Sequence, residues 1–273
     1  LQAALSIVAY AGQGVSEIWV ADETYKPTTG TDRTATFQLA SGLTIYGGFA
    51  GASSPQTAYP DGETDPAQRA QTTDGSFVYA SVLSGDIGTI GSPGDNSYHV
   101  VTGSGTISTA VLDGVTITGG NASVYGADNG NGGGLFVAAG SPTVRNCTFI
   151  ANYGAGNGGA GYIDNGSSPS FTNCVVTGNT GLNSGGFHGS NSSAANNPHY
   201  MNCMFRGNSS TGASGAAGAL FIAHGSAVVA GCTFIGNTVM GQGGAIYSAN
   251  NTATITNCTF VANTQTAAGS GVM

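Results

Sequence analysis

The sequence has little charge, and basic residues are especially scarce. Only 7% of its 273 residues are charged, and 5 Lys and Arg against 13 Asp and Glu give a net charge of −8. Nucleic acids and anionic membrane surfaces are bound through clustered basic side chains, so neither is an expected partner. No apolar run reaches the 18 or more residues of a membrane-spanning helix, so we expect no transmembrane segment in this sequence.

The few charges are unevenly distributed. Beyond Asp113 the chain carries only four charged side chains: Asp128, Arg145, Asp164 and Arg206. The second half therefore presents a neutral surface of Gly, Ser, Thr, Asn and Ala. A content of 47 Gly is compatible with disorder, but 40% hydrophobic residues set at regular intervals favour a packed core.

Cysteine is also scarce, and all 5 copies sit in one repeated motif. The motif reads NCTFIAN at 146–152, and versions of it recur at 173–179, 202–208, 231–237 and 257–263. The steps from Cys to Cys are 27, 29, 29 and 26 residues, and each copy places a large side chain three residues before the Cys and another two residues after it. A local pattern that recurs at such a period indicates a repeat architecture.

Each repeat predicts two short strands. The Cys and the large residue two positions later share one face of a strand, and the residue between them points the other way. A second strand precedes it and is marked by a pair of small residues followed by apolar ones, as in GGGLF (132–136) and GGAIY (243–247). The repeats show no helical periodicity, so we expect them to form the coils of a right-handed parallel β-helix, stacked about 4.8 Å apart.

Equivalent side chains form columns in such a stack. The Cys residues predict five buried free thiols, because stacked Cβ atoms about 4.8 Å apart exceed the roughly 3.5–4.5 Å that a disulfide requires. A second column is predicted from the Asn five residues after each Cys, at a turn where Asn tolerates a left-handed backbone and bonds amide to amide along the stack. Its members are Asn152, Asn179, Asn208, Asn237 and Asn263.

The first 120 residues are less regular. Apolar residues at the N-terminus lie on one face of a short helix, which we expect to cap the open edge of the first coil. The chain is expected to form a single all-β domain, 1–273, of about eight or nine coils, and to be a fragment of a longer chain. We divide it into a cap and first strand (1–27), irregular coils (28–120) with a protruding polar loop (50–76), and regular repeats (121–273).

Carboxylates are the first candidates for chemistry. Asp128 and Asp164 are the only ones in the repeat region, and no third carboxylate joins them. Asp86, Asp95 and Asp113 would hold calcium if they were stacked, although Asp at such positions more often accepts backbone hydrogen bonds in turns. Neither group forms a recognisable acid–base pair. We therefore predict no catalytic residue, no metal site and no cofactor.

Histidines and tyrosines are the remaining candidates. The histidines fall in different coils and give no Ser-His-Asp or Cys-His order: His99, His188, His199 and His224. We expect His99 and His199 to face outward from strands. Exposed aromatic residues in a row would indicate a carbohydrate-binding module, and the candidates are Tyr153, Tyr162 and Tyr247, of which the last two also fit the core pattern.

Two signatures together, GGA[ILV] and FxxN, resemble the repeats of polymorphic outer-membrane proteins. GGAI stands at Gly243–Ile246, and FxxN at Phe149/Asn152, Phe205/Asn208, Phe234/Asn237 and Phe260/Asn263. The segments IWVADETYKP and LTIYGGF resemble the opening coils of secreted β-helix proteins of the pectin-lyase-like class. The resemblance implies an extracellular or bacterial cell-surface location and an adhesive role.

These observations predict a non-catalytic structural or adhesive β-helix that self-associates into a surface assembly or filament through its uncharged faces. The expected partners are other copies of the chain, neighbouring surface proteins or cell-surface carbohydrate. Two alternatives stay open. One is a carbohydrate-active enzyme, a polysaccharide lyase or glycoside hydrolase, with its carboxylates in the first half of the chain. The other is a carbohydrate-binding module.

Overall fold

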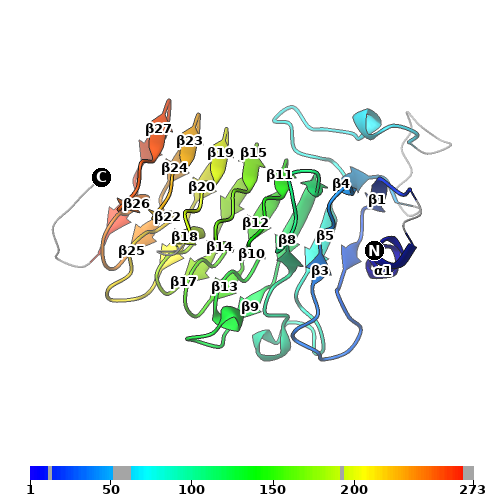
Figure 1. Cartoon of the computed structure of the whole chain (residues 1–273), viewed down its shortest axis with the longest axis horizontal. Coiled ribbons are helices and arrows are strands. Elements are labelled where there is room, and N and C mark those ends of the chain that lie inside the picture. Colours follow the sequence, from blue (N-terminus) through cyan, green and yellow to red (C-terminus); the bar gives the residue numbers. More distant parts are fainter. Residues whose placement is uncertain (12–13, 52–62, 191–193, 267–273) are drawn as a thin grey trace.

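The computed structural model describes residues 1–11, 14–51, 63–190 and 194–266. These residues wind into a parallel β-solenoid of about eight turns, which confirms the predicted all-β fold (Figure 1). A regular turn passes through four strands, and strands at equivalent positions in successive turns pair in parallel. None of the helices in these ranges is long and apolar enough to cross a membrane.

Four sheets run along the stack, and we name them A to D in the order in which a turn passes through them. Sheet A contains β1 (Glu17–Ala21), β4 (Thr44–Phe49), β7 (Val111–Asp113), β11 (Thr143–Arg145), β15 (Ser170–Thr172), β19 (His199–Met201), β23 (Val228–Ala230) and β27 (Thr254–Thr256). Sheet B contains β2 (Thr24–Tyr25), β5 (Ser81–Ser84), β8 (Val115–Thr118), β12 (Thr148–Ile150), β16 (Val175–Thr177), β20 (Met204–Arg206), β24 (Thr233–Ile235) and β28 (Thr259–Val261). Sheet C contains β9 (Asn121–Ala122), β13 (Tyr153–Gly154), β17 (Thr180–Gly181), β21 (Ser209–Ser210), β25 (Thr238–Val239) and β29 (Thr264–Gln265). Sheet D contains β3 (Phe37–Gln38), β6 (Val101–Thr102), β10 (Leu135–Ala138), β14 (Gly161–Asp164), β18 (Phe187–Ser190), β22 (Leu220–Ala223) and β26 (Ile246–Ala249).

Short helical segments lie outside the sheets: α1 (Gln2–Ala11) and the 3-10 turns η1 (Pro66–Gln68), η2 (Pro93–Asp95) and η3 (Asp128–Gly130). The predicted N-terminal helix is confirmed as α1, which lies at the N-terminal end of the stack (Figure 1). Leu5 of α1 joins the core, and Gln2 Nε2 donates to the carbonyl of Thr36 at 3.4 Å. Of the loop predicted at 50–76, residues 52–62 lie outside the described residues.

The strand predicted around each Cys is wrong in one respect. The chain makes two strands there, β11 in sheet A and β12 in sheet B, and Asn146 and Cys147 form the corner between them. The corner turns at Asn146, whose φ of 54° lies in the left-handed region that Asn and Gly adopt at least cost. The same left-handed position in other turns is held by Gly114, Asn173, Asn202, Gly231 and Asn257.

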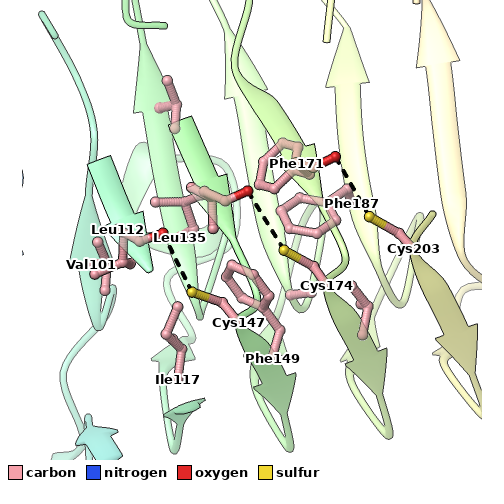
Figure 2. Packing of buried hydrophobic residues seen from close by; sticks show 14 of the residues in the cluster. Val101, Leu112, Ile117, Leu135, Cys147, Phe149, Phe171, Cys174, Phe187 and Cys203 are labelled. Atoms are coloured by element: carbon pink, nitrogen blue, oxygen red, sulfur yellow. Dashed lines mark hydrogen bonds between the residues drawn. The ribbon is translucent and has the colours of Figure 1, made fainter. Parts of the chain in front are cut away.

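The corner gives the cysteine column a more specific role than apolar packing. Each thiol points inward toward a carbonyl of the preceding turn, with Sγ–O distances of 3.6 Å from Cys147 to Leu112 and 3.7 Å from Cys174 to Val144 (Figure 2). All five thiols are free, as predicted. Four of them are buried, but Cys258 is only partly buried because it lies in the last described turn, so the expectation of five buried thiols is right for four.

The asparagine column is confirmed at the turn between sheets B and C. Each Nδ2 donates to the Oδ1 of the equivalent residue in the next turn at 2.8–3.0 Å, along Asn152, Asn179, Asn208, Asn237 and Asn263. The same Oδ1 accepts the backbone N–H of the preceding Asn at 3.0–3.1 Å. The left-handed backbone predicted for these residues is wrong, because it belongs to the residue before each of them: Ala151, Gly178, Gly207, Gly236 and Ala262.

Columns of equivalent side chains fill the interior. In sheet B, the rings of Phe205, Phe234 and Phe260 stack with centroids 4.8 and 5.0 Å apart. Gly161 occupies an inward position of sheet D, where an added Cβ would lie 2.4 Å from the Phe187 ring. Because Gly161 has no side chain, the inner column of sheet D has room for the Phe187 ring of the next turn.

Replacing a buried ladder amide is expected to be far more destabilising than replacing an outer one. Asn179→Ala removes the acceptor of two donors on Asn152 and leaves the Phe149 carbonyl without its Nδ2 donor. We expect a loss of about 2–4 kcal/mol in the free energy of unfolding, because buried polar groups are left unpaired. Asn173→Gly, at an exposed corner position, is expected to cost less than about 1 kcal/mol because Gly accepts the left-handed backbone. Equilibrium urea unfolding measures both, and equal losses would contradict the ladder's role.

Candidate functional site

The three carboxylates considered as a calcium site do not share one position. Asp86 and Asp95 lie between β5 and β6, where Asp86 accepts two hydrogen bonds of 3.0 Å from the N–H of Gly91 and Asp95 accepts the N–H of Thr89 at 2.8 Å. Asp113 ends β7 in sheet A and has other partners. In the described ranges, no group of three or more His, Cys, Asp or Glu side chains is placed to hold a metal ion. Asp86 and Asp95 instead act as turn acceptors.

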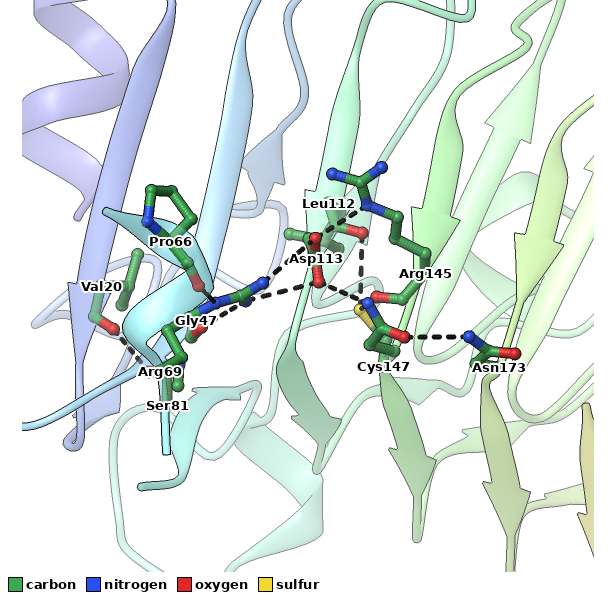
Figure 3. Close-up of polar contacts among 12 residues, drawn as sticks. Val20, Gly47, Pro66, Arg69, Ser81, Leu112, Asp113, Arg145, Cys147 and Asn173 are labelled. Atoms are coloured by element: carbon green, nitrogen blue, oxygen red, sulfur yellow. Dashed lines mark hydrogen bonds and ion pairs between the residues drawn. The ribbon is translucent and has the colours of Figure 1, made fainter. Parts of the chain in front are cut away.

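Asp113 is the buried centre of an ion cluster (Figure 3). Its side chain is 3% exposed. Arg145 Nε donates to Oδ2 at 2.7 Å, Asn146 Nδ2 donates to Oδ1 at 2.8 Å, and Arg69 donates to both oxygens at 3.4 Å. Because both oxygens are committed to donors within the protein, Asp113 is poorly placed to exchange a proton with a substrate.

Arg69 belongs to a segment, residues 63–80, that we call the strap. Residues 71–76 of the loop predicted here are exposed, while Arg69 and Phe77 hold the segment against the corner between sheets A and B. Arg69 Nη1 donates to the Gly47 carbonyl at 2.8 Å, and its guanidinium carbon lies 4.3 Å from the centroid of the Phe77 ring. Gly114, with φ 78°, makes this contact possible because an added Cβ would lie 2.6 Å from Phe77 and 2.7 Å from Arg69.

A groove of about 610 Å³ lies between the strap and the solenoid. The strap contributes Asp74, Phe77 and Tyr79 to its wall. The solenoid contributes outward side chains of sheet B and the corner amides: Thr116, Thr148, Val175, Met204, Asn146, Asn173 and Asn202. Among the lining residues, all of them in the described part of the chain, Asp74 is the one with a formal charge.

The corner amides of Asn146, Asn173 and Asn202 form an outward row over three successive turns, which sequence analysis did not identify; Gly holds the corner position in the turns on either side. Asn173 Nδ2 donates to Asn146 Oδ1 at 3.3 Å. Asn173 Oδ1 and the amide of Asn202 have no hydrogen-bond partner among the described residues, so they remain available to a ligand. A signal was present, because Asn precedes Cys in four of the five motif copies.

The carboxylates of the repeat region both act on Tyr162. Asp164 ends the same strand, β14, and Asp128 begins η3. Burial, together with the negative charges of Asp164 and Asp128 and a hydrogen bond to Asp164, raises the pKa of Tyr162 above its usual value of 10. The phenol therefore stays protonated at neutral pH and serves as a donor. The pair has no third carboxylate beside it within the described ranges.

Tyr162 belongs to an aromatic row on the outer face of sheet D. Its successive members, with centroids 5.9, 5.7, 4.0 and 5.2 Å apart, are Phe136, Tyr162, His188, Phe221 and Tyr247. The core position considered for Tyr162 and Tyr247 is therefore wrong, because they pair with the outward residues of neighbouring strands. Tyr153 lies in sheet C, apart from the row. The rings cover one another's faces, so the interior members offer edges rather than the open faces on which a sugar stacks.

Two of the four histidines contact the aromatic row: His188 within it and His99, whose ring centroid lies 4.8 Å from that of Phe136. His188 is 6% exposed, lies between two rings of the row, and has its Nδ1 3.2 Å from Ser184 Oγ. Burial lowers its pKa to about 3, so it is neutral at physiological pH. His99 precedes β6 rather than lying in a strand, and its Nδ1 is 3.0 Å from the Gly132 carbonyl. His199 faces outward from β19, as predicted, and His224 sits at a left-handed turn with φ 56°.

The buried thiols are poor nucleophiles. Burial raises the pKa of Cys147 to about 12, and the thiolate is the reactive form. The groove instead brings amides and hydroxyls together beside the rings of Phe77 and Tyr79. That arrangement is suited to binding an uncharged molecule. No protein-family model, curated protein or solved structure matches the chain.

His188 is expected to make the stability of the protein fall in acid. Its folded pKa of about 3 lies below the ordinary 6.5, so the unfolded chain binds a proton that the folded chain does not. Stability should therefore decline by about 1.4 kcal/mol per pH unit as the pH falls from 6.5 toward 3. His188→Phe should remove this contribution because Phe does not titrate, and the fold should tolerate it because the neighbouring turns hold Phe221 and Tyr162 at this position.

Urea unfolding at pH 7 and pH 4.5 measures the effect as the difference between wild type and variant. The exposed His199→Phe is the matched control and should keep the wild-type pH dependence. A His188→Phe protein with an unchanged pH dependence would show that this ring is not buried in its neutral form.

Proposed function

We propose that this chain is a non-catalytic, extracellular structural and adhesive β-helix. The observation that carries the proposal is the use of polar side chains within the stack. Asparagine amides bond to one another from turn to turn, which holds the rod in register without the use of charged side chains. A rod of this kind holds its outer rows and its strap at fixed positions, which suits the presentation of a binding surface.

The placement of the carboxylates supports a non-catalytic role. A retaining or inverting glycosidase divides acid and base roles between two carboxyl groups that flank the bond to be broken. Asp113 is enclosed by Arg69, Arg145 and Asn146, while Asp86 and Asp95 accept backbone hydrogen bonds. The alternative of a polysaccharide lyase or glycoside hydrolase has no comparable support from the described residues.

The proposed location follows from the resemblance of the motifs. The GGA[ILV] and FxxN signatures resemble repeats of polymorphic outer-membrane proteins, and the parallel solenoid is compatible with that class and with pectin-lyase-like secreted proteins. We place the protein outside the cell or on a bacterial surface on that basis. Its partners are other copies of the chain, neighbouring surface proteins or carbohydrate.

Self-association is part of the proposal and rests on the last described turn. The strands β26, β27, β28 and β29 each end their sheet among the described residues, and no described strand pairs with their outer edges. Two residues of the core columns, Ile255 and Phe260, are 41% and 47% exposed there. An unpaired strand edge beside apolar side chains and without charge is a template for another copy of the same edge.

The non-catalytic role predicts that the protein releases no product from polysaccharides. Purified protein is incubated with neutral and acidic polysaccharides, with and without calcium, and new reducing ends and unsaturated products are measured against a protein-free blank. We expect no difference from the blank. Product formed by the wild type and lost in Asp113→Asn or Asp128→Asn would overturn the proposal in favour of an enzyme.

Self-association predicts sedimentation that depends on protein concentration. Sedimentation velocity should show species larger than the monomer as concentration rises, and Ile255→Lys should weaken association at least about tenfold because the contact would then bury a charge. Ile90→Lys is the control, since Ile90 is 82% exposed in the first half of the chain and should leave association unchanged. Monomers at every concentration, or equal effects of the two variants, would count against this surface.

A further inference from the structure

We infer that the groove between the strap and the corner of sheets A and B binds an uncharged, linear oligosaccharide that lies along the stack. The inference deepens the proposed adhesive function and rests on it, because the groove is taken to hold a saccharide without cleaving it. It concerns a different face from the aromatic row on sheet D, whose interior rings cover each other. The inference is based on the residues that line the groove.

The charges around the groove favour an uncharged ligand. No Lys or Arg is among its lining residues, which all belong to the described part of the chain. The Arg69 guanidinium is buried against Asp113, and Arg145, which gives its Nε to Asp113, does not line the groove. Asp74 is the single carboxylate, and hydrogen bonds from Thr72 and Ser76 lower its pKa. One exposed carboxylate gives little attraction for a cationic ligand in water.

The floor of the groove disfavours a peptide bound by strand addition. That mode needs an exposed sheet edge with free N–H and C=O groups. The floor is formed by β8, β12, β16 and β20, and each of these strands is paired on both sides within sheet B. The groove therefore presents side chains, not backbone groups, to its ligand.

Those side chains suit a chain of sugar units. The corner amides Asn146, Asn173 and Asn202 recur once per turn, about 4.8 Å apart along the stack. Amides donate and accept hydrogen bonds, as sugar hydroxyls do. The rings of Phe77 and Tyr79 supply apolar surface beside them. A linear polymer with one unit per turn would meet free amide groups in two successive turns, at Asn173 and Asn202, while the Asn146 amide is already bonded to Asp113 and Asn173. The groove spans about three such units at the strand spacing.

The strap makes the groove a preformed site. The Phe77 ring packs against Gly48 and Gly114, where an added Cβ would lie 2.7 and 2.6 Å from it. Arg69 ties the same segment to the Gly47 carbonyl and to Asp113. Binding to a wall that is already ordered avoids the entropic cost of ordering a loop.

The test is titration calorimetry of the full chain with a panel of defined probes. The uncharged probes are linear hexasaccharides of glucose, xylose, mannose and N-acetylglucosamine, and the comparison probes are an acidic hexagalacturonate and a proline-rich peptide. Asn202→Gly removes a free corner amide and should weaken binding roughly fivefold. Tyr79→Ala removes a wall ring and should weaken it roughly tenfold.

Asn257→Gly is the matched control. Asn257 holds the same left-handed corner position, with φ 52° against 53° for Asn202, but does not line the groove. Binding of an uncharged hexasaccharide that falls in Asn202→Gly and Tyr79→Ala, and not in Asn257→Gly, supports the inference. Absence of binding by every uncharged probe, binding of only the acidic probe or the peptide, or an equal loss in the control overturns it. Cleavage of a bound hexasaccharide would overturn the non-catalytic function while leaving the binding site in place.

Discussion

The in-register asparagine ladder is the constraint on which the rest of this structure depends. From Asn179 onward, each ladder Oδ1 accepts from both the side chain and the backbone of the Asn in the preceding turn. Each Nδ2 also donates to a carbonyl within a sheet B strand of the preceding turn, as Asn179 does to Phe149. A slip of one residue would break all of these contacts and turn the core columns outward. Loops between turns can therefore vary in length, but the registry of the ladder cannot.

The corner between sheets A and B divides the repeat into inner and outer functions. Its left-handed residue turns the chain, and its neighbour sends a thiol toward a carbonyl that the preceding turn offers, as Cys147 does with Leu112. The amide of the left-handed residue remains outside. The adjacent Asn and Cys of the motif thus have different roles. The Cys makes a buried contact, and the Asn side chains form an outward row in which Asn173 and Asn202 keep free hydrogen-bonding groups.

The groove depends on the irregular first half of the chain as much as on the repeats. The regular turns supply a flat outer face, which by itself has no wall. The strap supplies the wall and is held by Arg69, whose charge is balanced by that of Asp113. The ion cluster therefore has a positional role, and the side chains left free around it are amides, hydroxyls and rings.

The sequence alone determined the repeat, the parallel stack, the free thiols and the asparagine ladder, because each depends on spacing between like residues that recurs in five copies. The sequence did not show where the chain turns between sheets A and B. An Asn such as Asn146 can stand at a left-handed corner between two strands or within a single strand, and the sequence pattern is the same in both cases. Only the folded chain showed that Tyr162 and Tyr247 lie on the outer face of sheet D. The alternation of inward apolar and outward polar residues is hard to recognise in this strand, because a small residue such as Gly161 occupies an inward position. The groove required the tertiary structure for a further reason. The contacts that build it, from Phe77 to Gly114 and from Arg69 to Asp113, join segments far apart in sequence that share no motif.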